Sequence, residues 1–253
     1  MCNIFDTHAH YDDTRFDQDR ETLLLSMESK NVCGIINCGC DIDSSLRSVE
    51  FSKKYPFMYA AVGYHPENIP ENSEFDEATL ISLIKEAKTV AIGEIGLDYY
   101  WDSSRAEAQK VFFEKQLCLA EKFDMPVIIH SRDACEDTLQ IIKHHNVRGV
   151  MHCFSGSVET AEEYIKLGFY LGFGGAVTFK NAKRAVSVVQ AVPMDRILLE
   201  TDCPYMAPEP FRGKRNDSSL IEFVAQKIAE IKKISPETVK SATLNNAKKL
   251  FCI

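Results

Sequence analysis

Four histidines and two carboxylates in this sequence have the side chains and the spacing of metal ligands. His8 and His10 are two residues apart, so on a strand their side chains point to the same side. Glu94 lies within the apolar stretch 90–98, where a buried carboxylate is costly unless it is paired or bound to a metal. Three further candidate ligands each follow an apolar stretch of their own: His130, His152 and Asp202.

The number of candidate ligands predicts a centre with two divalent ions. One catalytic zinc ion typically takes three protein ligands and a water, so six groups are too many for one ion. Two ions about 4 Å apart that share a carboxylate and a hydroxide would use all six. Imidazole and carboxylate donors suit zinc or manganese, and magnesium remains open. We therefore expect Glu94 to bridge the ions and a bridging hydroxide to attack a phosphoryl or carbonyl centre. Asp6, with the parity of His8, would orient a ligand from one layer deeper.

The candidate ligands lie at the ends of eight short apolar runs. Continuous apolar runs of this length are typical of strands that are covered on both faces, as in a parallel sheet. The sequence predicts strands over 3–6, 32–38, 58–63, 90–96, 126–130, 149–153, 170–174 and 197–202.

Amphipathic, charge-bearing stretches separate the strands and predict helices. Ser104 and Glu107 have the spacing of a capping box at the start of the longest one. Ser235 and Pro236 form a good N-cap and first-turn pair for a further helix to about residue 250. The other helices are predicted over 17–30, 43–54, 76–88, 104–123, 133–145, 157–167, 181–191 and 218–232.

Eight strands alternating with eight helices fit either a (β/α)8 TIM barrel or a doubly wound open sheet. The positions of the seven histidines favour the barrel, in which the chemistry lies at the C-terminal ends of the strands. Chance would place about one histidine there, whereas all except His144 and His145 follow a predicted strand. No linker-like tract divides the chain, so we expect one domain over residues 1–253, a TIM barrel with an additional C-terminal helix.

Composition narrows the class of protein. A net charge of -8 argues against a protein that coats nucleic acid through a basic surface, although an enzyme can still grip a strand end locally. No run approaches the roughly 18 apolar residues of a membrane span. The start, residues 1–6, enters a strand at once without the basic and apolar segments of a secretory signal. We therefore expect a cytoplasmic protein with reduced thiols, without a membrane partner.

The motifs around these residues resemble those of the TatD family of metal-dependent deoxyribonucleases, within the amidohydrolase superfamily. The resemblance runs from residue 3 to the C-terminus, with the motifs in order. It rests on Asp6–His10, Gly63–Pro66, Gly93–Tyr99, His130–Arg132, His152–Gly156, Leu199–Pro204 and Arg212–Asn216.

The resemblance implies roles for the ligands. His8, His10 and Asp202 would hold one ion, and His130 and His152 the other, while Glu94 would bridge them. Glu94 and Asp202 would be the catalytic residues, since Asp202 would also orient or deprotonate the attacking water. Family members hydrolyse phosphodiester bonds in DNA, often as 3′-to-5′ exonucleases on single strands. We therefore expect the protein to be a monomeric DNase.

Two other functions stay open. An amidohydrolase acting on a carbonyl substrate, such as an amide, an ester or a D-aminoacyl-tRNA, would use the same metals. A non-enzymatic metal-binding barrel is the second alternative, which the loss of a ligand would favour; all six ligands are present.

Four residues are candidates for substrate contact, each with a structural alternative. His65 would touch the scissile phosphate or be a satisfied histidine at a strand end. Glu200 shares the expected inward parity of Asp202, and would contact an ion or its water, or be a buried carboxylate bonded to a neighbour. Arg132 and Arg212, the latter in the loop 212–215, would bind phosphate bidentately or form structural ion pairs.

One further feature bears on the substrate. Residues 99–101, two tyrosines and a tryptophan, would stack on bases or pack as a loop lid.

The last basic motif departs from the family, in which an acidic residue and a proline follow Arg-Asn. Here Asn216 is followed by Asp217 and Ser218, so the rigidity of this loop is in question.

Overall fold

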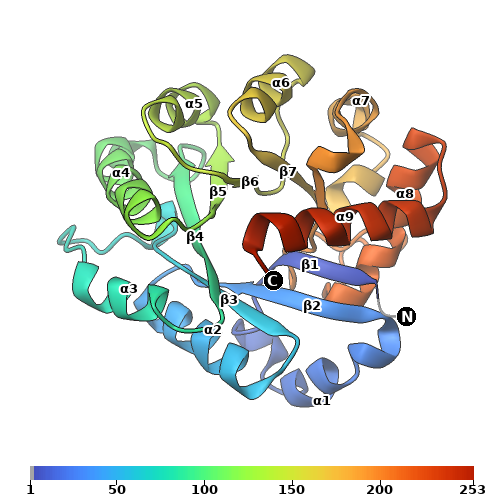
Figure 1. Ribbon diagram of the computed structural model, residues 1–253, viewed down its shortest axis with the longest axis horizontal. Coiled ribbons are helices and arrows are strands. Elements are labelled where there is room, and N and C mark those ends of the chain that lie inside the picture. The colour runs from blue at the N-terminus through green and yellow to red at the C-terminus, as the bar shows by residue number, and fades with distance from the viewer. Residues whose placement is uncertain (1–2) are drawn as a thin grey trace. The chain divides into compact units, whose positions relative to one another are not determined.

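The computed structural model describes residues 3–253, and its strands alternate with helices along the chain. Eight parallel strands follow the order β1 to β8, and a further helix, α9, comes last (Figure 1). This is the topology of a (β/α)8 barrel with an added C-terminal helix, as predicted. The predicted domain over 1–253 includes residues 1–2, which lie outside the described residues. Within the described part, the chain divides into two compact units, and a single domain stays a prediction.

Unit 1 contains the chain up to Asn37 and the residues from Cys153 to Ile253. In it β1 pairs with β2 and β7 with β8, and a bridge joins Ala9 at the end of β1 to Cys203 after β8. Its strands are β1 (Ile4–Ala9), β2 (Val32–Cys38), β7 (Tyr170–Phe173) and β8 (Ile197–Leu199), and its helices are α1 (Arg20–Leu25), α6 (Val158–Lys166), α7 (Lys183–Ala191), α8 (Ile221–Lys232) and α9 (Pro236–Phe251).

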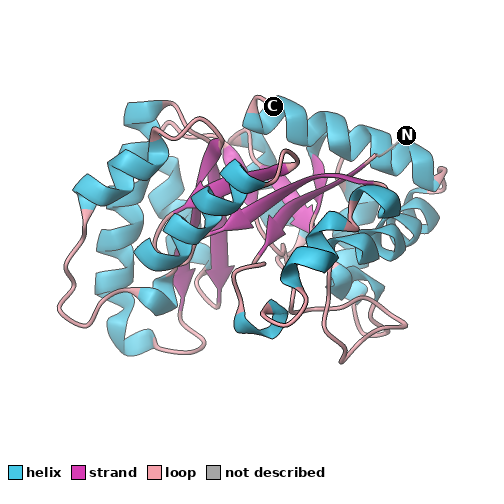
Figure 2. Ribbon diagram, turned by 90° about the horizontal axis from the view of Figure 1, so that it is seen from below, coloured by secondary structure: helices cyan, strands magenta, loops and turns pink. Residues whose placement is uncertain are grey.

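The last helix packs against strands of unit 1. Helix α9 contacts β1 and β8. It ends beside the C label in Figure 2. Ser235 caps it by accepting a hydrogen bond from the Thr238 backbone N–H, so the predicted N-cap is confirmed. The buried Asn246 amide donates to the carbonyls of Met194 and Ile197, each at 2.8 Å. These bonds fix the start of β8, whose far end leads into the candidate ligands.

Unit 2, Cys38–His152, holds the other four strands, in the order β3 to β6. Two buried glutamines of its longest helix fix the ends of two strands. Gln116 Oε1 accepts from the Tyr64 N–H at 2.7 Å, and Gln109 Oε1 accepts from the Asp98 N–H at 2.8 Å. The strands are β3 (Met58–Val62), β4 (Thr89–Asp98), β5 (Val127–Arg132) and β6 (Gly149–Met151), and the helices are α2 (Ile42–Lys54), α3 (Glu77–Ile84), α4 (Ala106–Phe123) and α5 (Cys135–Lys143).

Three local predictions were wrong. Strand β8 ends at Leu199 and not at residue 202, so Glu200 and Asp202 lie in a loop and share no strand parity. The helix predicted over 17–30 is the short α1 followed by a 3₁₀ turn over 28–30. The capping box at Ser104 is absent, because Asp102 caps a 3₁₀ turn there and α4 begins only at Ala106.

Among residues 3–253, no helix has the length and apolar character needed to cross a membrane.

Candidate metal centre

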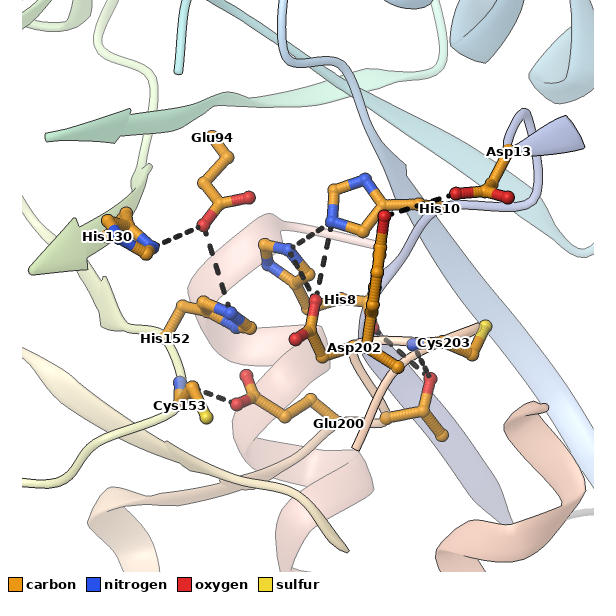
Figure 3. A network of polar contacts seen from close by, with 12 residues as sticks. His8, His10, Asp13, Glu94, His130, His152, Cys153, Glu200, Asp202 and Cys203 are labelled. Atoms are coloured by element: carbon orange, nitrogen blue, oxygen red, sulfur yellow. Dashed lines mark hydrogen bonds and ion pairs between the residues drawn. The ribbon is translucent and has the colours of Figure 1, made fainter. Parts of the chain in front are cut away.

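Three predicted ligands of unit 1 converge at the end of β1. His8 lies in the strand, His10 directly after it, and Asp202 in the loop after β8. The Nε2 atoms of the two histidines are 3.0 Å apart, and Asp202 Oδ1 is 3.5 Å from that of His10 and 3.9 Å from that of His8 (Figure 3). Two imidazole nitrogens and a carboxylate oxygen this close together fit a divalent cation of the zinc or manganese type.

The backbone of the loop after β8 aims Asp202 at these histidines. Its φ of 58° places Asp202 in the left-handed region, which aspartate tolerates better than most residues. The Asp202 N–H donates to the His8 carbonyl at 2.9 Å, and the His10 N–H donates to the Cys203 carbonyl at 2.8 Å. The loop therefore follows β1 and holds the carboxylate beside both imidazoles.

Asp6 supports this cluster through the backbone and a neighbouring loop. Its buried carboxylate accepts hydrogen bonds from the N–H of His8 at 3.2 Å, from the N–H and hydroxyl of Thr201 at 3.0 and 2.6 Å, and from the Ser218 hydroxyl at 2.6 Å. Burial raises the pKa of Asp6 to about 7, although these four bonds oppose the shift. We predicted that Asp6 orients a ligand, and it does so through the main chain of His8.

The departure from the family at Ser218 has a structural counterpart. The Ser218 N–H donates to the Tyr11 hydroxyl at 2.9 Å, a bond that proline cannot make. The preceding Asn216 is fully buried, and its amide donates to the carbonyls of Thr201 and Tyr205 at 3.0 and 2.8 Å. Hydrogen bonds from Asn216 thus tie its loop to the loop that carries Asp202, and the bond from Ser218 fixes a position where the family has a proline.

In unit 2, three imidazoles surround one oxygen of Glu94. The carboxylate lies inside β4 and is 4% exposed. Its Oε1 is 3.0 Å from His130 Nδ1, 3.7 Å from His65 Nε2 and 3.8 Å from His152 Nε2 (Figure 3 draws the His130 and His152 contacts). The structure thus brings Glu94 together with both predicted ligands of the second ion. The set of His65, Glu94 and His130 also has the proximity of a metal-binding group.

Asp98 contacts the candidate ligand His130, although the sequence did not single it out. Its Oδ2 accepts a hydrogen bond from His130 Nε2 at 2.9 Å, so the other ring nitrogen, Nδ1, is left to face Glu94. No signal in the sequence pointed to this contact, because the predicted strand ended at residue 96 whereas β4 continues to Asp98.

The two carboxylates also set the charge of His130. Burial lowers its pKa, but the hydrogen bonds to Asp98 and Glu94 outweigh this and raise the pKa to about 9. Burial likewise favours the neutral form of Asp98, yet the bonds from His130 and from the Trp101 and Tyr100 N–H groups hold its pKa below the usual value. The two carboxylates therefore stabilise a positive charge between them, which a site for a metal cation also requires.

Two of the candidate residues for substrate contact, His65 and Glu200, have different surroundings. His65 Nδ1 accepts from the Glu67 N–H at 3.2 Å while its Nε2 faces Glu94, so the ring sits within the cluster. Glu200 Oε1 accepts from the Cys153 N–H at 2.6 Å, and a Cβ at Gly172 would come within 2.3 Å of Glu200 Oε2. Glu200 thus occupies space that the glycine leaves, which suits the buried-carboxylate alternative.

The arginines of the candidate substrate region also differ in their contacts. Arg215 forms a two-pronged ion pair with Asp19, at 2.8 and 2.6 Å, so it has the structural role that we kept open for this loop. Arg212 is exposed and lies 4.2 Å over the Phe179 ring. Arg132 is exposed at the end of β5 and stacks on Tyr100. Contact with substrate stays a prediction for Arg132 and Arg212.

Comparison with known proteins shows which class of enzyme this chain belongs to. The chain is 46% identical over 253 residues to the uncharacterized metal-dependent hydrolase YabD of Bacillus subtilis, with 99% of each chain covered. It is 33% identical to the uncharacterized metal-dependent hydrolase YjjV of Escherichia coli, over 99% of this chain and 98% of that protein. This protein is therefore a metal-dependent hydrolase.

The family follows from a match over nearly the whole chain. The model of the family described as TatD related DNase matches residues 5–252, and the chain belongs to the TatD family. The crystal structure of the TatD homologue YjjV from Escherichia coli superposes with a TM-score of 0.91 at 32% identity, covering 100% of this chain and 99% of that one. A TatD family hydrolase from Entamoeba histolytica shares the fold, with a TM-score of 0.88 at 23% identity over 98% of each chain. The predicted TIM-barrel fold is confirmed.

Proposed function

We propose that this hydrolase is a DNase of the TatD type, which cleaves phosphodiester bonds from the 3′ end of single-stranded DNA as a monomer. The observation that supports this most strongly is the family membership together with an intact set of donors. His8, His10 and Asp202 are gathered in unit 1, and Glu94, His130 and His152 in unit 2. No predicted ligand is turned away from its cluster, which supports an enzyme over a barrel that has lost its chemistry.

The proposal includes two divalent ions. His8, His10 and Asp202 would hold one, His130 and His152 the other, and Glu94 would be shared, as the resemblance of the motifs implies. Bound ions of this kind would polarise a phosphoryl oxygen and lower the pKa of water. The choice between zinc, manganese and magnesium stays open, although imidazoles outnumber carboxylates in the set.

The protein's own residues would orient the reacting groups. Asp202 is 21% exposed, whereas Glu94 is 5% exposed at its side chain, so Asp202 is the carboxylate that a water can reach. It would orient that water and accept its proton as the new oxygen–phosphorus bond forms. The bond from phosphorus to the leaving oxygen then breaks, and that oxygen takes up a proton. Glu94, which lies between imidazoles, would be the shared ligand.

Hydrolysis of end-labelled single-stranded DNA tests the proposal. The protein is stripped with a chelator and resupplied separately with magnesium, manganese or zinc. A ladder that shortens from the 3′ end and returns with metal is the expected result. If metal binds but no phosphodiester is cleaved, the proposal is wrong. The same preparations are assayed on an ester and an amide, where turnover would identify a carbonyl substrate instead.

A further inference from the structure

The turn that follows β4 exposes two large aromatic side chains. Tyr100 is 53% exposed and Trp101 is 64% exposed, and their rings meet edge to face with centroids 4.9 Å apart. Large aromatic side chains are usually buried, and adjacent exposed ones mark interaction sites. Tyr99, which we had grouped with them, is different: its hydroxyl donates to Asp137 at 2.8 Å, so it fastens the turn to α5.

Arg132 adds a positive charge to this surface. Strand pairing sets its position, because Arg132 is the partner of Asp98 in the β4–β5 ladder and its carbonyl accepts from the Tyr99 N–H. The guanidinium carbon lies 3.8 Å from the centre of the Tyr100 ring and 5.3 Å from that of Trp101. A guanidinium stacked on a ring keeps its N–H edge available, and that edge matches phosphate. We call Tyr100, Trp101 and Arg132 the aromatic platform.

One buried carboxylate joins the platform to the candidate metal centre. Asp98 Oδ1 accepts from the N–H groups of Tyr100 and Trp101, at 2.9 and 3.1 Å, while its Oδ2 accepts from His130 Nε2. Asp98 itself is 1% exposed, and Gln109 holds its backbone N–H. One buried carboxylate therefore binds both the turn that carries the platform and His130, a predicted metal ligand.

We propose that the aromatic platform binds the nucleotide next to the cleaved bond in a single-stranded nucleic acid. A base stacks on Tyr100 or Trp101, and Arg132 pairs with a phosphate. Single strands fit because their bases have free faces, whereas each base of a duplex is already stacked on its neighbours. A single local arginine also suits a protein whose net charge is -8. This inference rests on the proposed nuclease function and names the feature that selects its substrate.

Trp101 gives a direct readout, since it is the only tryptophan in the sequence. Its fluorescence is followed in chelator-treated protein, so that nothing is cleaved, during titration with oligothymidylate, with a duplex of equal length, and with an abasic strand. Quenching by the oligothymidylate is expected, with at least about tenfold weaker binding of the other two probes. Equal binding of the abasic strand or of the duplex would overturn the proposal.

Variants test whether the platform carries the binding. Tyr100→Ala or Arg132→Ala should weaken oligothymidylate binding by about 5- to 100-fold. Trp101→Ala should do the same when binding is followed by the anisotropy of a labelled strand. Val111→Ala, at a position 48% exposed on α4, is the matched control and should bind normally. Unchanged binding in all three platform variants would overturn the inference.

The same measurements separate this inference from the nuclease proposal. Binding at the platform without cleavage by any loaded metal would refute the nuclease and leave the platform intact. Normal cleavage of single strands by Tyr100→Ala and Trp101→Ala would refute the platform and leave the nuclease intact.

Discussion

The chemistry of this protein depends on where single carboxylate oxygens point. Glu94 directs one oxygen at three imidazoles, and Asp98 directs one at the far nitrogen of His130. A buried charge with such partners avoids most of the cost of desolvation before any cation arrives. A cation that binds this cluster would therefore take the place of the proton on His130.

Removing the charge of Glu94 or Asp202 should abolish turnover. Glu94→Gln and Asp202→Asn keep the shape of each side chain but weaken the metal site and, at Asp202, remove the proton acceptor. We expect kcat/KM for DNA to fall at least about a thousandfold while the circular dichroism spectrum stays unchanged. Glu159→Gln, at an exposed position on α6, is the control. Activity within tenfold of the parent in either variant would refute the site assignment.

The partner of His130 makes a second prediction at this scale. In Asp98→Asn the side chain can still accept from the Tyr100 and Trp101 N–H groups, but it no longer carries the charge that fixes His130 Nε2 as the donor. Affinity for metal should fall about 10- to 100-fold, as measured by competition with a chromophoric chelator. Oligothymidylate binding by the metal-free protein should not change. Unaltered metal affinity would show that Asp98 only shapes the turn.

At the scale of elements, the sequence predicted the positions of strands better than their ends. Strand β2 occupies the predicted residues, because a strand buried on both faces is apolar over most of its length, here all but Asn37. Strand β8 stops early, since the Asp6 carboxylate binds Thr201 and the backbone turns left-handed at Asp202. Such long-range hydrogen bonds leave no periodic pattern. The neighbours of Glu94 were predictable from strand ends, whereas the Asp98–His130 contact needed coordinates.

The fastening of the β4 turn to α5 should depend on pH. Burial and the bond to Asp137 raise the pKa of Tyr99 to about 12, above the ordinary value of 10.0. The folded state thus keeps a proton that the unfolded state loses, so this stabilisation is complete below pH 10 and disappears as pH rises towards 12.

Tyr99→Phe tests this coupling. Because the hydroxyl is partly exposed and screened by solvent, the variant should lose only about 1 kcal/mol in the free energy of unfolding at pH 8. The difference from the parent should shrink as urea unfolding is repeated towards pH 11. Tyr59→Phe, in β3, is the control. A difference that is constant with pH would contradict the assigned ionisation.

At the scale of the whole molecule, residues far apart in the sequence meet only in the folded chain: in unit 1, His8 and His10 lie beside Asp202. Hydropathy and alternation predicted the (β/α)8 fold correctly, and such a barrel brings side chains to the C-terminal ends of its strands. A cation bound by such ligands has little affinity for the unfolded chain. Its binding free energy therefore appears as stability of the fold.

Metal removal should consequently lower the melting temperature. At a metal concentration of 100 Kd, one ion contributes about 2.7 kcal/mol, which for a chain of 253 residues corresponds to a shift of about 5–10 °C. Calorimetry of chelated and zinc- or manganese-loaded protein measures this shift, and elemental analysis of the loaded protein should give two ions per chain. In Glu94→Gln both the shift and the second ion should be reduced, because the proposed shared ligand has lost its charge. One ion per chain in the parent would contradict the dinuclear centre while leaving a mononuclear hydrolase.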